Sequence, residues 1–100
     1  MTQANLGLLV RLKAKSSKES EVEAFLQNAV ALAKAEKGTT TWFALKLEKN
    51  VFGIFDTFAD AEGRNAHRNG EIASQLRQVA GDLLSEPPTI EPVDVLGYKL

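Results

Sequence analysis

The chain has 100 residues, which corresponds to one domain over residues 1–100, because domains usually contain about 100–200 residues. Hydrophobic residues make up 44% and charged residues 25%, a composition that excludes a disordered or low-complexity chain. The net charge of −1 argues against a nucleic-acid partner, and the absence of cysteine excludes disulfides and thiolate metal ligands. With one histidine and scattered carboxylates, we expect no metal site.

Two patterns bear on where the protein resides. No apolar run approaches the ~18 residues that a membrane span needs. Residues 1–5 lack the basic flank and apolar stretch of a secretory signal. We therefore expect a cytoplasmic protein with no membrane partner.

The first half of the chain begins with a predicted strand and a predicted helix. The strand covers residues 6–14, where apolar residues alternate with a period of two: Leu6, Leu8, Val10, Leu12 and Ala14. A period of 3.6 predicts a helix over residues 18–37. Ser16 and Glu19 are expected to form a capping box at its start, and Gly38 to end it.

Two aromatic-rich strands are predicted next, over residues 39–48 and 51–58, joined by a short polar hairpin connection. The single Trp and four of the five Phe lie within these seventeen residues, 42–58. Both faces of the first of these strands are apolar, with Trp42 on one side and Phe43 on the other. Because a strand exposed on one face should alternate cleanly, we expect the second face to be covered as well.

The second half of the chain predicts a divided helix and a last strand. Asp60 is expected to cap a helix that runs to about Arg68, and Asn69-Gly70 to break it. A second helical piece follows over residues 71–84. The last strand is predicted over residues 90–98, with Pro92 early in the run.

This order predicts an α+β, ferredoxin-like βαββαβ fold. Right-handed crossovers place the first and third strands at the centre of a four-stranded antiparallel sheet, with both helices on one face. The other face would expose aromatic and aliphatic side chains. We therefore expect a second copy to pack against it, which makes the protein a homodimer.

A cavity is predicted beside the divided helix. Between Ala59 and Gly70 the chain has no side chain that is both large and apolar. Small residues cannot fill the space between helix and sheet at interior density, so the segment either lies very close to the sheet or leaves a cavity beneath it. Gly63 and Gly70 would let such a segment move as a lid. The alternative is an exposed polar helix with no cavity.

Six segments of the chain resemble the antibiotic biosynthesis monooxygenase family. They follow in the family's order over nearly the whole chain: 10–15, 21–26, 35–38, 39–44, 53–58 and 66–67. The resemblance implies a dimeric α/β barrel with a pocket between sheet and helices in each subunit. It also implies oxidation of phenols or hydroquinones with O₂, without flavin or metal, so that no cofactor is expected.

The resemblance assigns roles to a few residues only. His67 matches the helix histidine typical of the family. Phe58 stands where many members have Trp, and Gly70-Glu71 stands where a second histidine often occurs. A phenol reacts with O₂ once it is deprotonated, so a base in a dry pocket is the chemistry to look for.

His67 is the candidate base, because it is the one side chain that titrates near neutrality without help. Asp56 is the second catalytic candidate, either orienting His67 or accepting the phenolic proton itself. The remaining candidates would bind the substrate, with Arg64 stabilising the developing anion and the others forming the walls: Trp42, Ile54, Phe55 and Phe58.

Two functions follow from these assignments. The first is a cofactor-independent monooxygenase that acts on a small phenolic or quinol-like compound. The second is a non-catalytic or stress-associated dimeric barrel, whose cavity holds a small aromatic ligand that His67 merely contacts. The Phe at position 58 and the missing second histidine favour the second reading.

Overall fold

The structure is a computed structural model that describes residues 3–100. Its elements are, in chain order, β1 (Leu6–Lys13), α1 (Glu19–Ala35), β2 (Thr39–Glu48), β3 (Val51–Phe58), α2 (Ala61–Arg68), α3 (Glu71–Leu83) and β4 (Thr89–Asp94). The predicted order is confirmed, including the break between α2 and α3. Within the described residues, no helix is long and apolar enough to cross a membrane.

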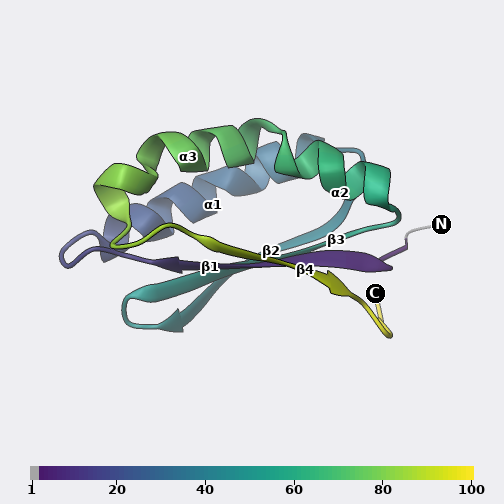
Figure 1. The fold of residues 1–100 in the computed structure, drawn as a ribbon, viewed down its shortest axis with the longest axis horizontal. Helices are drawn as coiled ribbons and strands as arrows, with labels where there is room; N and C mark the ends of the chain where they lie inside the picture. The colour runs from purple at the N-terminus through teal and green to yellow at the C-terminus, as the bar shows by residue number, and fades with distance from the viewer. Residues whose placement is uncertain (1–2) are drawn as a thin grey trace.

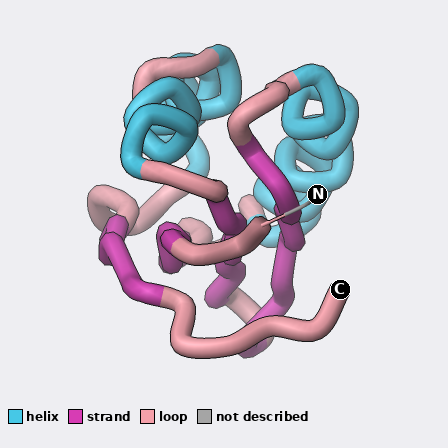
Figure 2. The backbone as a smooth tube through the Cα atoms, turned by 90° about the vertical axis from the view of Figure 1, so that its right-hand side faces the viewer, coloured by secondary structure: helices cyan, strands magenta, loops and turns pink. Residues whose placement is uncertain are grey.

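The strands form one antiparallel sheet in the order β2-β3-β1-β4, as the ferredoxin-like fold predicts. All three helices lie on one face of this sheet (Figures 1 and 2). The register pairs Asp56 with Leu8 on one side and with Trp42 on the other, so these three side chains share the helix-covered face.

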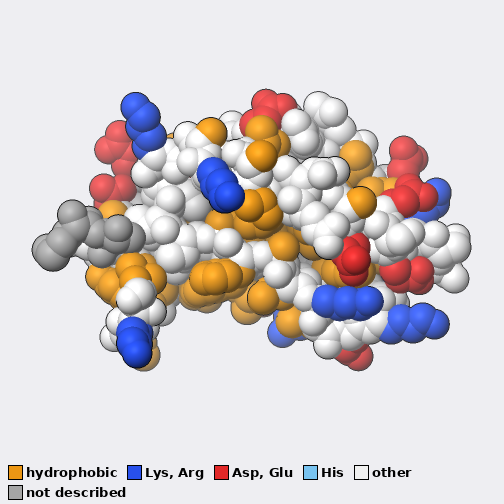
Figure 3. All heavy atoms as spheres, turned by 180° about the vertical axis from the view of Figure 1, so that it is seen from behind, with side chains coloured by type: hydrophobic (Ala, Val, Ile, Leu, Met, Phe, Trp, Pro, Cys, Tyr) orange, Lys and Arg blue, Asp and Glu red, His pale blue; other side chains and the backbone are white. Residues whose placement is uncertain are grey.

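The main core lies between this face and the helices. Alternate residues of β1 and β3 are buried against apolar residues of α1 and α3, and the largest fully buried side chains include Leu8, Leu12, Leu26, Phe52 and Phe58. The opposite face carries apolar side chains with no cover in the single chain. Phe43 is 54% exposed and Leu47 is 41% exposed. Figure 3 shows hydrophobic side chains gathered along the lower side of the molecule, beneath the strands.

Several predicted element ends differ in the structure. The helix predicted over residues 18–37 spans Glu19–Ala35 and has its C-cap at Glu36, so Gly38 does not end it. The capping box is wrong, because α1 begins after Lys18 and has no side-chain hydrogen bond at its N-terminus. The first strand ends one residue early, and Ala14 forms an isolated bridge with Leu84. The last strand ends at Asp94 rather than at residue 98, because only β1 lies beside it and β1 begins at Leu6, the partner of Asp94. The cap at Asp60 is confirmed, since its side chain accepts a 2.9 Å hydrogen bond from the Gly63 N–H.

The start of α2 packs very closely against the turn between α1 and β2. A Cβ atom added at Gly63 would lie 2.8 Å from the Gly38 carbonyl oxygen, and one added at Gly38 would lie 2.8 Å from the Gly63 Cα. The contacting atoms belong to the backbone, which cannot move aside cheaply. The absence of side chains at both positions therefore lets α2 approach β2, and this approach fixes the height of His67 above the sheet.

Candidate active site

A cavity of about 850 Å³ lies between the sheet and the helical pair α2 and α3. Figure 1 shows that α3 runs above β4. Residues of both elements line the cavity. Most of its walls are apolar, from three strands and from the underside of α3: Leu8, Val10, Ile54, Ile90, Ile72, Leu76 and Ala80. The volume is within the range of small-molecule sites.

Small residues on α3 account for this space. Ala73, Ala80 and Gly81 line the cavity, and a Cβ added at Gly81 would meet no atom within 4 Å. The position of the cavity therefore corrects the sequence prediction, which placed it beneath residues 59–70. From that segment only the C-terminal part reaches it, through Asn65, His67, Arg68 and Asn69.

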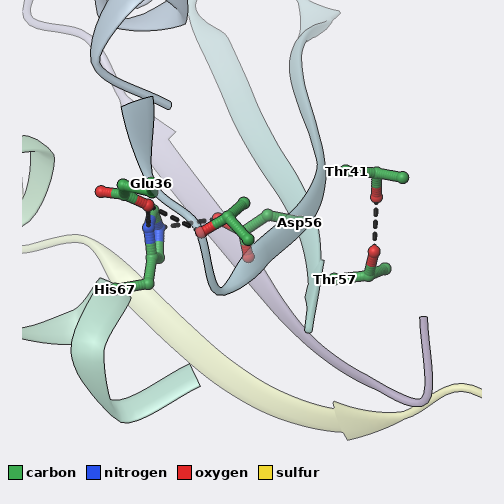
Figure 4. Close-up of polar contacts among 6 residues, drawn as sticks. Glu36, Thr41, Asp56, Thr57 and His67 are labelled. Atoms are coloured by element: carbon green, nitrogen blue, oxygen red, sulfur yellow. Dashed lines mark hydrogen bonds and ion pairs between the residues drawn. The ribbon is translucent and has the colours of Figure 1, made fainter. Parts of the chain in front are cut away.

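Three ionisable side chains from distant parts of the sequence lie in contact with one another, and two of them line the cavity. His67 lies on α2, and its Nε2 atom is 2.8 Å from Oδ2 of Asp56 on β3. Its Nδ1 atom is 2.5 Å from Oε1 of Glu36, the residue that directly follows α1. Thr39 donates a 2.7 Å hydrogen bond to the same Glu36 oxygen. Figure 4 shows the imidazole ring between the two carboxylates.

Exposure rises along this chain of contacts. The Asp56 side chain is 0% exposed, that of His67 is 9% exposed and that of Glu36 is 20% exposed. Asp56 and His67 both line the cavity, whereas Glu36 does not. The three groups thus form a polar path from the cavity wall towards the surface.

The buried carboxylate of Asp56 has unused hydrogen-bonding capacity. Within the described residues, neither of its carboxylate oxygens makes a hydrogen bond of normal geometry, although Oδ2 is in close ionic contact with His67. The indole N–H of Trp42, its neighbour on β2, is also buried without a partner. Buried polar groups are nearly always hydrogen-bonded in folded proteins, so the unpartnered Oδ1 atom on a cavity wall is a position that a ligand could complete.

The surroundings raise the pKa of both Asp56 and His67. Burial disfavours the carboxylate and raises the pKa of Asp56 above its ordinary value, and the adjacent imidazole offsets only part of this effect. Burial alone would lower the pKa of His67, but the carboxylates of Asp56 and Glu36 together raise it above its ordinary value. Both shifts favour the protonated form of the group concerned.

Phe58 holds the imidazole ring in place. It is fully buried, and its ring centroid lies 5.3 Å from that of His67 at an angle of 43°. Phe58 packs beside the histidine and does not line the cavity. Its position suggests that it orients His67 and does not form a wall for a ligand.

The structure brings together three of the seven predicted site residues, namely His67, Asp56 and Ile54. Trp42 packs against the core clusters under α1 and lies outside the cavity lining. Phe55 lies on the opposite face of the sheet, where it pairs with Leu9 and Phe43. Arg64 lies on α2 but does not line the cavity.

Sequence reasoning missed two parts of the site. One is Glu36, whose only signal was its place in the short connection between a helix and a strand. The other is the wall from α3 and the segment that follows it, including Ile72, Leu76 and Ile90. Among the described residues, no three potential metal ligands form a group that could hold a metal ion.

Comparison with solved structures shows a similar protein of unknown function from Nitrosomonas europaea. The two are 51% identical over 100% of this chain and 97% of the other, with a TM-score of 0.97. A "putative antibiotic biosynthesis monooxygenase" from Caulobacter crescentus is 20% identical to this chain. The match covers 96% of this chain and 93% of the Caulobacter protein, with a TM-score of 0.81. A second protein of that description, from Nitrosomonas europaea, is 15% identical over 92% of this chain and 99% of its own, with a TM-score of 0.82. No protein-family model and no curated protein matches the chain.

Proposed function

The chain belongs to the same family as the Nitrosomonas europaea protein of unknown function and has the fold of the antibiotic biosynthesis monooxygenases, and on this basis we propose that it is a cofactor-independent monooxygenase. Its substrate would be a small phenolic or quinol-like compound. One atom of O₂ would form a new C–O bond on the ring and the other would leave as water. A hydroquinone would thus become a hydroxyquinone, and the substrate itself would supply all four electrons.

The observation that supports this proposal is the buried carboxylate of Asp56 on the wall of an apolar cavity, because one of its oxygens, Oδ1, has no hydrogen-bond partner among the described residues. Deprotonation converts a phenol into the phenolate, which donates an electron to O₂ more readily. A carboxylate with a raised pKa is a stronger base than an ordinary aspartate, and the apolar walls exclude competing water.

The geometry favours Asp56 over His67 as the group that accepts the substrate proton. Both ring nitrogens of His67 already lie against carboxylates, so neither is free to face a substrate. Asp56 Oδ1, in contrast, has no partner within the described residues. His67 then acts as a positioning residue, which holds Asp56 and stabilises its charge.

The proton that Asp56 accepts would stay in the site during turnover. The oxygen atom that leaves as water takes up two hydrogens, and the substrate is their source. Asp56 would therefore return its proton to the reduced oxygen, which restores the carboxylate for the next turnover. Glu36 contacts the other ring nitrogen of His67 and would hold the imidazole against Asp56.

Oxygen consumption in metal-free buffer tests the proposal. We expect at least one compound from a set of hydroquinones, naphthols and anthrones to be oxidised faster by the wild type than in the uncatalysed reaction. Asp56→Asn should reduce that rate about 10²–10⁴-fold, the usual contribution of a general base. Asp82→Asn makes the same chemical change at an exposed site outside this cavity and should leave the rate unchanged.

A specific result would overturn the proposal. If every compound reacts at the uncatalysed rate while aromatic ligands still raise the melting temperature, the protein is a ligand-binding barrel without catalytic activity. The same holds if Asp56→Asn retains the wild-type rate, because the base would then lie elsewhere.

A further inference from the structure

Two exposed arginines line the cavity and lie at its rim. Arg68 is the last residue of α2 and Arg77 lies in the middle of α3, and both line the cavity while remaining exposed. Among residues 3–100, neither forms an ion pair with a carboxylate. Their guanidinium groups are therefore available to a ligand.

The residues around Arg77 leave room for its side chain to reach a ligand. Ala73 and Gly81 lie one helical turn before and after it on the same stripe of α3. Both line the cavity, and open space surrounds Gly81. Arg77 is thus the one long side chain on this stripe.

The charges of the cavity are separated by depth. The fully buried carboxylate of Asp56 lies on the inner wall, and the two exposed arginines lie on the solvent side. Glu86 also lines the rim, so two arginines against one glutamate leave an excess of positive charge there. Apolar residues such as Ile72 and Leu76 line the space between the two ends.

From this arrangement we infer that the ligand is an aromatic carboxylic acid that carries a hydroxyl group. Its hydroxyl would face Asp56, its ring would lie against the apolar walls and its carboxylate would bind Arg68 and Arg77 at the rim. Arginine suits this role because its planar fork matches the two oxygens of a carboxylate. The placement of the hydroxyl group beside Asp56 rests on the proposed function. The inference adds that the substrate carries a carboxylate, which the proposed function leaves open.

Binding measurements test the inference independently of turnover. The probes are 4-hydroxybenzoate and 6-hydroxy-2-naphthoate, each compared by calorimetry at pH 7.5 with its neutral primary amide. We expect the wild type to bind at least one acid at least tenfold more tightly than its amide, with a preference that weakens as salt is added. In Arg68→Gln/Arg77→Gln the acid and the amide should bind equally, with the affinity for the amide unchanged.

A control separates a local effect from a general loss of charge. Lys34→Gln removes one positive charge from an exposed position on α1, outside the cavity, and should keep the preference for the acid. The inference is overturned if neither acid binds measurably, if the amides bind as well as the acids, or if the double arginine variant keeps the wild-type preference.

The two proposals fail in different ways. A preference for acids that depends on the arginines, without O₂ consumption, would refute the monooxygenase and leave the binding mode intact. Oxidation of neutral quinols at a rate that the double arginine variant retains would refute the binding mode and leave the monooxygenase intact.

Discussion

At the scale of single residues, His67 reports on the whole site because it is the only histidine in the chain. Its imidazole NMR signals therefore need no assignment by mutation. Two carboxylates raise its pKa above the ordinary histidine value, and Glu36→Gln removes one of them. We predict that the pKa of His67 in this variant lies below that of the wild type. Glu62→Gln, which neutralises an exposed glutamate of α2, should leave the pKa unchanged, and an equal pKa in all three proteins would refute the coupling.

The same coupling predicts how stability depends on pH. Folding raises the pKa of His67 above the unfolded value of about 6.5. The protonated histidine therefore stabilises the folded protein fully at pH values below about 6.5, and this stabilisation is lost as the pH rises through the folded pKa. Asp56 acts with the same sign in a window that begins at the ordinary aspartate pKa. We predict that the free energy of unfolding of the wild type falls with rising pH above about 6.5. Urea titrations should show a smaller fall in Glu36→Gln, and parallel curves would contradict the prediction.

At the scale of elements, the underside of α3 determines the size of the cavity. Leucine at position 81 would extend into space that is open in the wild type. It is also a better helix former than glycine, which is less favourable than alanine by about 0.8–1 kcal/mol. We predict that Gly81→Leu keeps or raises the melting temperature and weakens ligand binding at least tenfold. Gly81→Ala gains helix propensity without filling the space, so it should bind ligands like the wild type. Unchanged binding by Gly81→Leu would show that ligands bind elsewhere.

The contact between α2 and the turn before β2 has no room for a side chain at Gly63. A methyl group at position 63 would meet the Gly38 carbonyl oxygen at 2.8 Å, so one backbone segment would have to move. We predict that Gly63→Ala destabilises the protein by about 1–3 kcal/mol, the usual cost of overpacking. Because α2 bears His67, its NMR signals should shift as well. Denaturant unfolding and the imidazole spectrum measure the two effects, and an alanine variant as stable as the wild type would contradict this account.

These elements also show what the sequence could and could not predict. Periodicities of two and 3.6 identified β1, α1 and α3, because each of these half-buried elements repeats its apolar face locally. The helix α2 has no large apolar side chain and was predicted from its cap at Asp60 and the break at Asn69-Gly70. The same parity places Ile54 and Asp56 on one face and Phe55 on the other, so the expectation that Phe55 lines the cavity conflicted with its own pattern. Glu36 could not be predicted, because its partner His67 is 31 residues away and only the tertiary fold joins them. The cavity depends on which small residues of α3 face the sheet, which no local signal fixes.

At the scale of the whole molecule, the uncovered face of the sheet remains to be explained. Phe43 and Leu47 are the most exposed of its large apolar residues, and Leu9, Leu45 and Phe55 on the same face are only partly buried. A continuous apolar patch of this kind usually marks an interface in a soluble protein. A second copy of the chain fits it, because a symmetric dimer places the same patch on both partners.

We predict that the protein is a homodimer joined through this face, with a standard interface of about 800 Å² from each partner. Sedimentation equilibrium at micromolar concentration should give twice the mass of the chain. Phe43→Lys would bury two charges without partners at the interface, and it should produce a monomer or an aggregated protein. Ala31→Lys, at an exposed position of α1, should remain a dimer. A soluble wild-type monomer at this concentration would refute the interface, because the exposed Phe43 would then be stable in water without a partner.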